Sequence, residues 1–240
     1  MEEYEQIKLL LADETVLICS EELSQQSVVL REIQSIPSTN NDFIQVPKFV
    51  TRNVLSDIMY LLREKQFASV RNSSCLRIVE IMRTVDYLLI EEVMEPLKVI
   101  LKERLTFENA FPVFQIAKSI LSLEDISSHC SNIIMTFIQS YYEDYRQRCC
   151  SEDPYTTYYC DMPLSDIHTL INFQSREFTV AKIIVLENWW SKNRSQKWSK
   201  EVLLIADEIY NDACYIPRNE IRFMREIREK IIKTALVENY

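Results

Sequence analysis

The sequence predicts an α+β protein in which a small α/β lobe precedes an all-helical lobe. Short apolar segments typical of strands are concentrated in the first 50 residues, whereas apolar residues recur at helical spacing from Thr51 onward. The 240 residues also contain no glycine, although average usage would supply about 17. Turns that need a positive φ must therefore be built from other residues or avoided.

The first 50 residues predict a hairpin, a helical segment and a third strand. Gln6–Leu11 and Thr15–Cys19 are apolar segments that flank a three-residue turn ending at Glu14. A tight hairpin turn usually holds glycine there, so we expect Glu14 either to keep φ negative or to be strained. Glu21–Ile33 has roughly helical spacing, and Phe43–Pro47 is typical of a short strand closed by its proline.

The rest of the chain predicts helices with local start signals. The segment 72–74 can cap the second of them, and Pro96 lies in the first turn of the third. Pro112 marks the entry of the fourth, and Ser122 with Asp125 resembles a capping box for the fifth. The apolar faces fall within Val54–Leu62, Leu76–Val85, Val93–Leu105, Val113–Ile120, Ile126–Ile138, Leu164–Asn172, Thr179–Trp190, Ser199–Tyr210 and Asn219–Val237. Residues 141–160 lack a clear period and predict an extended loop.

Charge and cysteine usage indicate the compartment. The net charge is −9 and the sequence pI about 5.0, so we expect no general attraction to nucleic acid or to an anionic membrane. No apolar run approaches the roughly 20 residues of a membrane helix, and the acidic start lacks the basic region of a signal peptide. Seven cysteines form no disulfide framework. Free thiols in a cytoplasmic or nuclear protein are the simplest interpretation.

The residue types argue against an enzyme. Phosphate-binding loops and the GxSxG elbow need glycine, which this chain lacks. His129 and His168 lie in helical segments without a nearby serine or carboxylate pattern. Cys149, Cys150 and Cys160 with His168 have the count of a zinc site, but their CC-x9-C-x7-H spacing matches no common pattern, and zinc stays a minor alternative. We therefore predict no catalytic residue, cofactor, metal or small-molecule substrate.

The order of the segments is similar to that of a known family. Residues 7–105 resemble a BTB/POZ domain in the compact form found in elongin C. The resemblance lies in IKLLLADETVLICSEELSQQSVVLREI, FIQVPKFVTRNVLSDIMYLLREKQ and CLRIVEIMRTVDYLLIEEVMEPLKVILKERL. Residues 107–210 resemble a BACK domain through FENAFPVFQIAKSILSLEDISSHCSNIIMTFI and LSDIHTLINFQSREFTVAKIIVLENWWSKNR. We therefore expect a BTB/POZ-like domain at 1–106, a BACK-like domain at 107–215 and a C-terminal amphipathic helix at 216–240.

The resemblance implies a protein-binding function. It predicts a non-enzymatic adaptor or scaffold, with the role of substrate adaptor in a cullin-type ubiquitin ligase. The alternative is a structural component of a complex that forms a BTB-type homodimer or heterodimer and has no ubiquitin role. The cullin-facing surface would comprise helices at 52–66 and 76–83, extended by 109–119. Its candidate partner-binding residues are Arg52, Asp57, Tyr60, Arg63, Phe111 and Phe114.

Two other segments are candidate partner surfaces. The predicted tyrosine-rich loop includes Tyr141 and Tyr145, which offer contact area at low entropic cost. The apolar stripe of the last helix, which includes Met224 and Ile227, either packs on preceding helices or docks into a partner's groove. The basic stretch 191–200, with its neighbouring tryptophans, could bind single-stranded nucleic acid. The acidity of the chain argues against that partner.

Overall fold

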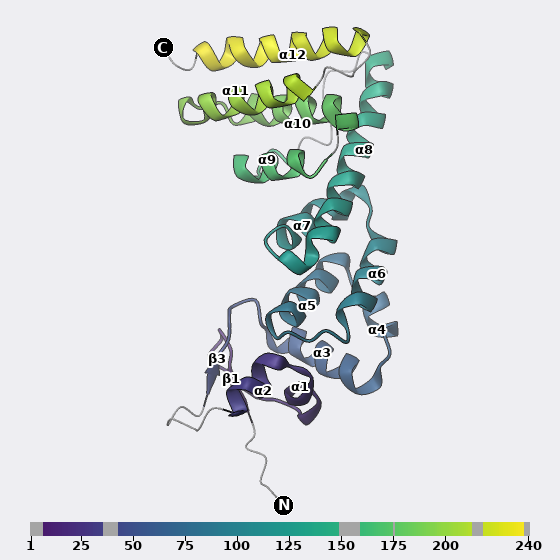
Figure 1. Cartoon of the computed structure of the whole chain (residues 1–240), viewed down its shortest axis with the longest axis vertical. Helices are drawn as coiled ribbons and strands as arrows, with labels where there is room; N and C mark the ends of the chain where they lie inside the picture. Colours follow the sequence, from purple (N-terminus) through teal and green to yellow (C-terminus); the bar gives the residue numbers. More distant parts are fainter. Residues whose placement is uncertain (1–6, 36–42, 149–158, 175, 213–217, 238–240) are drawn as a thin grey trace, which may run out of the picture. The chain divides into compact units, whose positions relative to one another are not determined.

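The computed structural model describes residues 7–35, 43–148, 159–174, 176–212 and 218–237 (Figure 1). The chain divides into two compact units, each described here by itself. The first unit runs to Leu105 and includes Ser119–Ile126; the second comprises Thr106–Lys118 and the residues from Ser127 onward. Most described residues are helical and three short strands form a sheet, which confirms the α+β class. None of the described helices combines the length and apolar character needed to cross a bilayer.

The sheet of the first unit has the strand order β2-β1-β3. β1 (Lys8–Leu10) pairs antiparallel with β2 (Val16–Ile18) and parallel with β3 (Ile44–Gln45), so Leu9 lies opposite both Leu17 and Ile44. Leu9 is fully buried. The predicted hairpin and third strand are therefore confirmed.

The hairpin turn places Glu14 in the left-handed region, with φ at 63°. The N–H of Glu14 donates to the carbonyl of Leu11 (3.0 Å), and the N–H of Leu11 donates to the carbonyl of Thr15 (2.9 Å). A three-residue hairpin loop that ends in a left-handed residue is the arrangement in which glycine is favoured. The hydroxyl and N–H of Thr15 both donate to the Asp13 carboxylate, which lowers the pKa of Asp13. The strained alternative for Glu14 is therefore the one observed.

Glu14→Gly should stabilise the protein. Relief of the left-handed strain, roughly 1–2 kcal/mol, outweighs the entropic cost of glycine, roughly 0.5–1 kcal/mol. We expect a net gain of about 0.5–1 kcal/mol in the free energy of unfolding, measured by urea denaturation followed by circular dichroism. Ala12→Gly is the matched control, because Ala12 lies in the same loop but is not at positive φ. A loss of stability in Glu14→Gly equal to that of the control would contradict the strain argument.

Six helices complete the larger segment of the first unit. The predicted single helix over Glu21–Ile33 is in fact two helices, which meet at Ser27. The first-unit helices are α1 (Glu21–Gln26), α2 (Val28–Ser35), α3 (Arg52–Glu64), α4 (Ala68–Arg71), α5 (Cys75–Tyr87) and α6 (Met94–Arg104). Pro96 lies in the first turn of α6, as predicted.

Ser27 separates α1 from α2 and links both to the end of α5. Its side chain is fully buried. Its N–H donates to the carbonyl of Leu23 (3.0 Å), which ends α1, and its hydroxyl accepts the N–H of Leu30 (3.1 Å) in the first turn of α2. The same hydroxyl donates to the carbonyl of Leu88 (2.6 Å), 61 residues away. One serine side chain therefore satisfies backbone groups at two helix ends.

Ser27→Ala should destabilise the first unit by about 1–3 kcal/mol, because it removes a helix cap and leaves the buried Leu88 carbonyl without its donor. The measurement is the urea midpoint followed by circular dichroism. Ser35→Ala is the matched control, since the Ser35 hydroxyl also donates to a backbone carbonyl (Glu32, 2.6 Å) but is exposed. Equal losses in the two variants would show that burial of the Ser27 bond is unimportant.

The segment Ser119–Ile126 is held to the first unit by polar contacts. The Ser122 hydroxyl donates to the Asp86 carboxylate (2.5 Å), and Asp125 pairs with Lys102 (2.7 Å) and Lys98 (3.3 Å). Burial opposes ionisation of Asp125, but the hydrogen bonds from the two lysines outweigh it and lower its pKa. The predicted capping box of Ser122 and Asp125 is therefore wrong, because both side chains point to partners outside their own helix.

The elements described in the second unit are all helices, and α10, α11 and α12 pack side by side (Figure 1). α7 begins at a capping box in which the Thr106 N–H donates to Asn109 (2.8 Å), so Pro112 lies inside the helix and not at its entry. Residues 141–148 belong to α8, which corrects the predicted loop; 149–158 lie outside the described residues. The helices are α7 (Phe107–Ala117), α8 (Glu124–Arg148), α9 (Leu164–Asn172), α10 (Thr179–Lys192), α11 (Gln196–Asn211) and α12 (Arg218–Val237).

Two adjacent tryptophans of α10 organise the core of the second unit. Trp189 and Trp190 are both buried. The Trp189 indole N–H donates to the carbonyl of Met162 (2.8 Å), and the Trp190 indole N–H donates to the hydroxyl of Thr234 in α12 (2.7 Å). Trp189 therefore belongs to the core, and Trp190 joins α10 to the last helix.

Candidate protein-binding site

The candidate site is the outer face of α3 and α5, which pack against each other in the first unit. Thr51 caps the start of α3, and its hydroxyl accepts the N–H of Val54 (3.4 Å). Ser74 caps the start of α5, and its hydroxyl accepts the N–H of Arg77 (3.1 Å). The capping of α5 within 72–74 is therefore confirmed. Both helices bury an apolar stripe, made of Val54, Leu55, Ile58, Leu61, Leu62, Cys75, Ile78, Val79, Ile81, Met82 and Val85.

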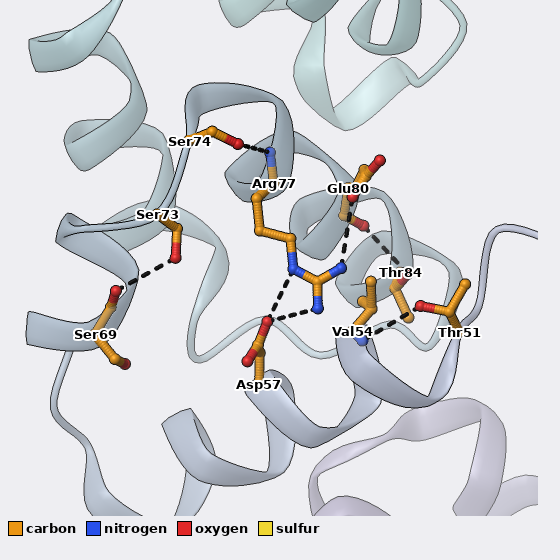
Figure 2. Close-up of polar contacts among 9 residues, drawn as sticks. All are labelled: Thr51, Val54, Asp57, Ser69, Ser73, Ser74, Arg77, Glu80 and Thr84. Atoms are coloured by element: carbon orange, nitrogen blue, oxygen red, sulfur yellow. Dashed lines mark hydrogen bonds and ion pairs between the residues drawn. The ribbon is translucent and has the colours of Figure 1, made fainter.

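An ion pair joins the two helices on this face. Figure 2 shows the Arg77 guanidinium between Asp57 of α3 and Glu80 of α5. Nε and Nη2 of Arg77 donate to Oδ2 of Asp57 at 3.0 and 2.8 Å, and Nη1 lies 3.5 Å from the Glu80 carboxylate. The side chains are partly exposed, so the interaction contributes no more than about 1 kcal/mol to stability. Its main effect is to hold the side chains of Arg77, Asp57 and Glu80 in one arrangement.

Exposed apolar side chains lie near this pair in sequence and helical position. Tyr60, three residues after Asp57, is 48% exposed, and Leu76, next to Arg77, is 40% exposed. Leu76 was predicted to belong to the core face, but it lies about 160° around α5 from Ile78 at 100° per residue and so points away from the core. An exposed tyrosine and leucine beside a half-buried arginine are typical of surfaces that bind proteins.

The four predicted residues of α3 all lie on the surface. Arg52 and Tyr60 are exposed, and Asp57 is half-buried in its pair with Arg77. Arg63 lies on another side of α3 and pairs with Glu22 of α1 (3.7 Å). Asp57 and Tyr60 are therefore the predicted residues that belong to the same face as Arg77.

The two partner-binding residues predicted in α7 are buried, so their predicted role is wrong. Phe111 and Phe114 are 2% and 0% exposed. The Phe111 ring packs edge-on against Phe107 (5.3 Å between centroids) and parallel to Tyr159 (5.9 Å), and Phe114 packs edge-on against Phe173 (5.9 Å). Both rings form the core of their own unit and leave no surface for a partner.

The other predicted partner residues have mixed positions. Tyr141 is half-buried and lies parallel to Phe137, with 6.5 Å between ring centroids. Tyr145 falls within α8, and its side chain lies outside the described part of the chain. Met224 is fully buried and Ile227 is half-buried. The packing interpretation of the last helix is therefore confirmed, and the proposed role of Met224 in docking is wrong.

α12 is also held by polar contacts to its neighbours. Arg228 donates to Asp207 of α11 (2.6 Å from Nη2), and Lys230 pairs with Glu187 of α10. These contacts, like the Trp190–Thr234 hydrogen bond, involve residues far apart in the sequence. They explain why the stripe of α12 is covered by its own chain.

The candidates for nucleophilic or acid–base chemistry are spread over the described residues. Burial raises the pKa of Cys19 to about 12, so this thiol is protonated at neutral pH. His168 lies 3.3 Å from Glu208, a pair 40 residues apart that the sequence did not indicate. The described residues contain no group of three metal-ligating side chains. Cys149 and Cys150 lie outside those residues, so the minor zinc alternative stays a prediction.

The basic stretch 191–200 does not present a row of aromatic rings. Trp189 and Trp190 are buried, and the half-buried Trp198 ring is covered by the Lys197 ammonium (4.3 Å from the ring centroid). Base stacking on the two buried rings is impossible without unfolding α10. The structure therefore weakens the nucleic-acid alternative further.

Comparison with known proteins gives no match: no protein-family model fits the chain and no curated protein is similar to it. The BTB/POZ and BACK resemblance therefore stays a prediction. The arguments below rest on the residues and contacts of the chain itself.

Met224→Ala should cost about 2–4 kcal/mol of stability, because it leaves a cavity between α12 and its neighbours. A residue that only contacts a partner would cost almost nothing in the isolated chain. The measurement is urea unfolding followed by tryptophan fluorescence, since Trp190 contacts α12. Arg225→Ala, at an exposed position of the same helix, is the control. Equal urea midpoints for Met224→Ala and Arg225→Ala would contradict the core role of Met224 and make it a partner-binding candidate again.

Proposed function

We propose that the chain is a non-enzymatic adaptor or scaffold that binds another protein through the outer face of α3 and α5. The observation that carries this proposal is the exposure of Tyr60 and Leu76 on the two helices that the Arg77–Asp57 ion pair joins. Binding energy at protein interfaces concentrates on tyrosine, tryptophan and arginine side chains that become desolvated. A partner that covers this face would bury such side chains with little loss of conformational freedom.

The arrangement of Arg77 favours a binding role over a catalytic one. Its guanidinium donates to Asp57 and pairs with Glu80, and these two carboxylates neutralise the positive charge that a reacting anion would need. The exposed Leu76 side chain has no reactive group. Burying it against a partner stabilises the complex by about 25 cal/mol for each Å² of apolar surface removed from water. These properties favour a surface that a partner protein recognises by its shape and by apolar contacts.

The finer proposal is that the partner is a cullin and that the chain serves as substrate adaptor of a ubiquitin ligase. It rests on the resemblance of residues 7–105 to the BTB/POZ family, in which the helices corresponding to 52–66 and 76–83 face the cullin. The face described above lies on the same two helices. The competing proposal, an assembly component without a ubiquitin role, predicts a BTB-type dimer that ignores cullins.

Tyr60→Ala and Leu76→Asp should each weaken binding to a cullin at least tenfold, equivalent to about 1.4 kcal/mol. The purified chain is tested against a panel of purified cullin N-terminal domains by calorimetry. Leu204→Asp is the matched control, because Leu204 is 65% exposed on α11 of the other unit and should leave binding unchanged.

Two outcomes would count against the proposals, at different levels. Failure to bind every cullin, together with a stable dimer in light scattering, would remove the ligase role and support the assembly component. Binding that is equally weakened by Leu204→Asp would remove the α3–α5 face as the site. Circular dichroism of each variant separates loss of binding from loss of fold.

A further inference from the structure

The outer face of the sheet carries a second apolar surface, built from different residues. Side chains alternate across a strand, so the neighbours of the buried Leu9 point to the opposite face. In the β1–β2 register Lys8 lies opposite Ile18, and Leu10 lies opposite Val16. Because Leu9 lies opposite Ile44, the preceding Phe43 falls on the outer face, and the Lys8 ammonium lies 5.8 Å from its ring centroid. We call Lys8, Leu10, Val16, Ile18 and Phe43 the sheet patch.

The sheet patch departs from the usual pattern of a sheet with one solvated face. Such a face normally carries polar side chains, because one side packs on the core and the other contacts water. Here Ile18 is 55% exposed, Phe43 47% and Val16 38%. Lys8 and Leu10 of the central strand are half-buried, and the polar Gln45, opposite Leu10, is exposed on the same face. Three exposed apolar side chains on a face that also carries one ammonium group are typical of a binding site.

We propose that the sheet patch binds an amphipathic helix of a different protein, which carries a carboxylate opposite Lys8. The size of the patch supports a helix. Three strands spaced about 4.8 Å apart span about 10 Å, and two rows of side chains lie about 7 Å apart along the strands. A helix with its side chains is about 10 Å wide and would cover both rows.

The charge on the patch decides between a foreign helix and a second copy of this chain. Lys8 has no carboxylate partner among the described residues, and a partner that covers the patch would remove its ammonium from water. Burial of an unpaired charge is strongly unfavourable, so the partner must supply an anion. Two copies packed face to face would bring the two Lys8 ammonium groups together, and each copy carries a net charge of −9. The repulsion between the two Lys8 ammonium groups and the repulsion between two acidic chains both disfavour self-association at this face.

The inference is independent of the proposed α3–α5 site, because the two surfaces share no residue. If both hold, the first unit joins two partners. If the cullin proposal fails, the proposal for the sheet patch is unaffected and is tested separately.

The test begins with photo-crosslinking of the full chain in the cells that produce it. The photoreactive residue p-benzoylphenylalanine replaces position 18 or, as the control, the exposed position 26 of α1. We expect position 18, but not position 26, to capture one protein through a segment that is amphipathic and carries aspartate or glutamate. A crosslink to a second copy, to another part of the same chain, or equally from both positions would overturn the proposal.

The captured segment is then synthesised and its affinity for the purified chain is measured at several salt concentrations. Ile18→Glu should weaken binding more than tenfold, and Lys8→Gln about five- to tenfold with loss of most of the salt dependence. Tyr60→Ala, on the other surface, should bind normally. Ile18→Ser provides a milder variant if Ile18→Glu disturbs the fold in circular dichroism. Unchanged affinity in both Ile18 variants, or in Lys8→Gln, would overturn the proposal.

Discussion

The absence of glycine is the constraint on which the first unit depends. Three turns of that unit require a positive φ, and they use Glu14, Lys65 and Leu89 at φ of 63°, 51° and 51°. A residue with a Cβ atom costs roughly 1–2 kcal/mol in this region. Because a domain is stable by only about 5–15 kcal/mol, three such turns consume a sizeable share of what packing provides. These turns are kept because packing and hydrogen bonds of the residues on either side fix the backbone at the turn.

The turn at Leu89 illustrates how the surroundings act. Leu88 and Ile90, on either side, are buried, whereas the Leu89 side chain is exposed. The N–H of Leu89 donates to the carbonyl of Asp86 and that of Ile90 to the carbonyl of Val85 (both 3.0 Å), which closes the end of α5. The burial of two neighbours therefore forces the residue between them to turn outward, whatever its type. The Ser27 hydroxyl on the Leu88 carbonyl holds the same point from another helix.

Local patterns predicted the strands and most helices because their signals lie within a few residues of each other. The features that could not be predicted depend on contacts between distant residues. The Asp57–Arg77 pair spans 20 residues, and nothing in either helix alone indicates it. Helical periodicity also shows that a helix has an apolar face but not what covers it. The apolar faces alone therefore predict Phe111 and Met224 as partner-binding residues, although their own unit buries both side chains.

The two candidate surfaces of the first unit should recognise partners by different physical means. On the α3–α5 face the Arg77 charge is already compensated by Asp57 and Glu80, so a partner gains mainly from contact with Tyr60 and Leu76. On the sheet patch the Lys8 charge has no such compensation among the described residues. Affinity at the first face should therefore depend on shape, whereas affinity at the second should depend on a carboxylate and fall as salt screens it. The first unit could in this way distinguish two partners by the chemistry of its two surfaces, without additional structural elements.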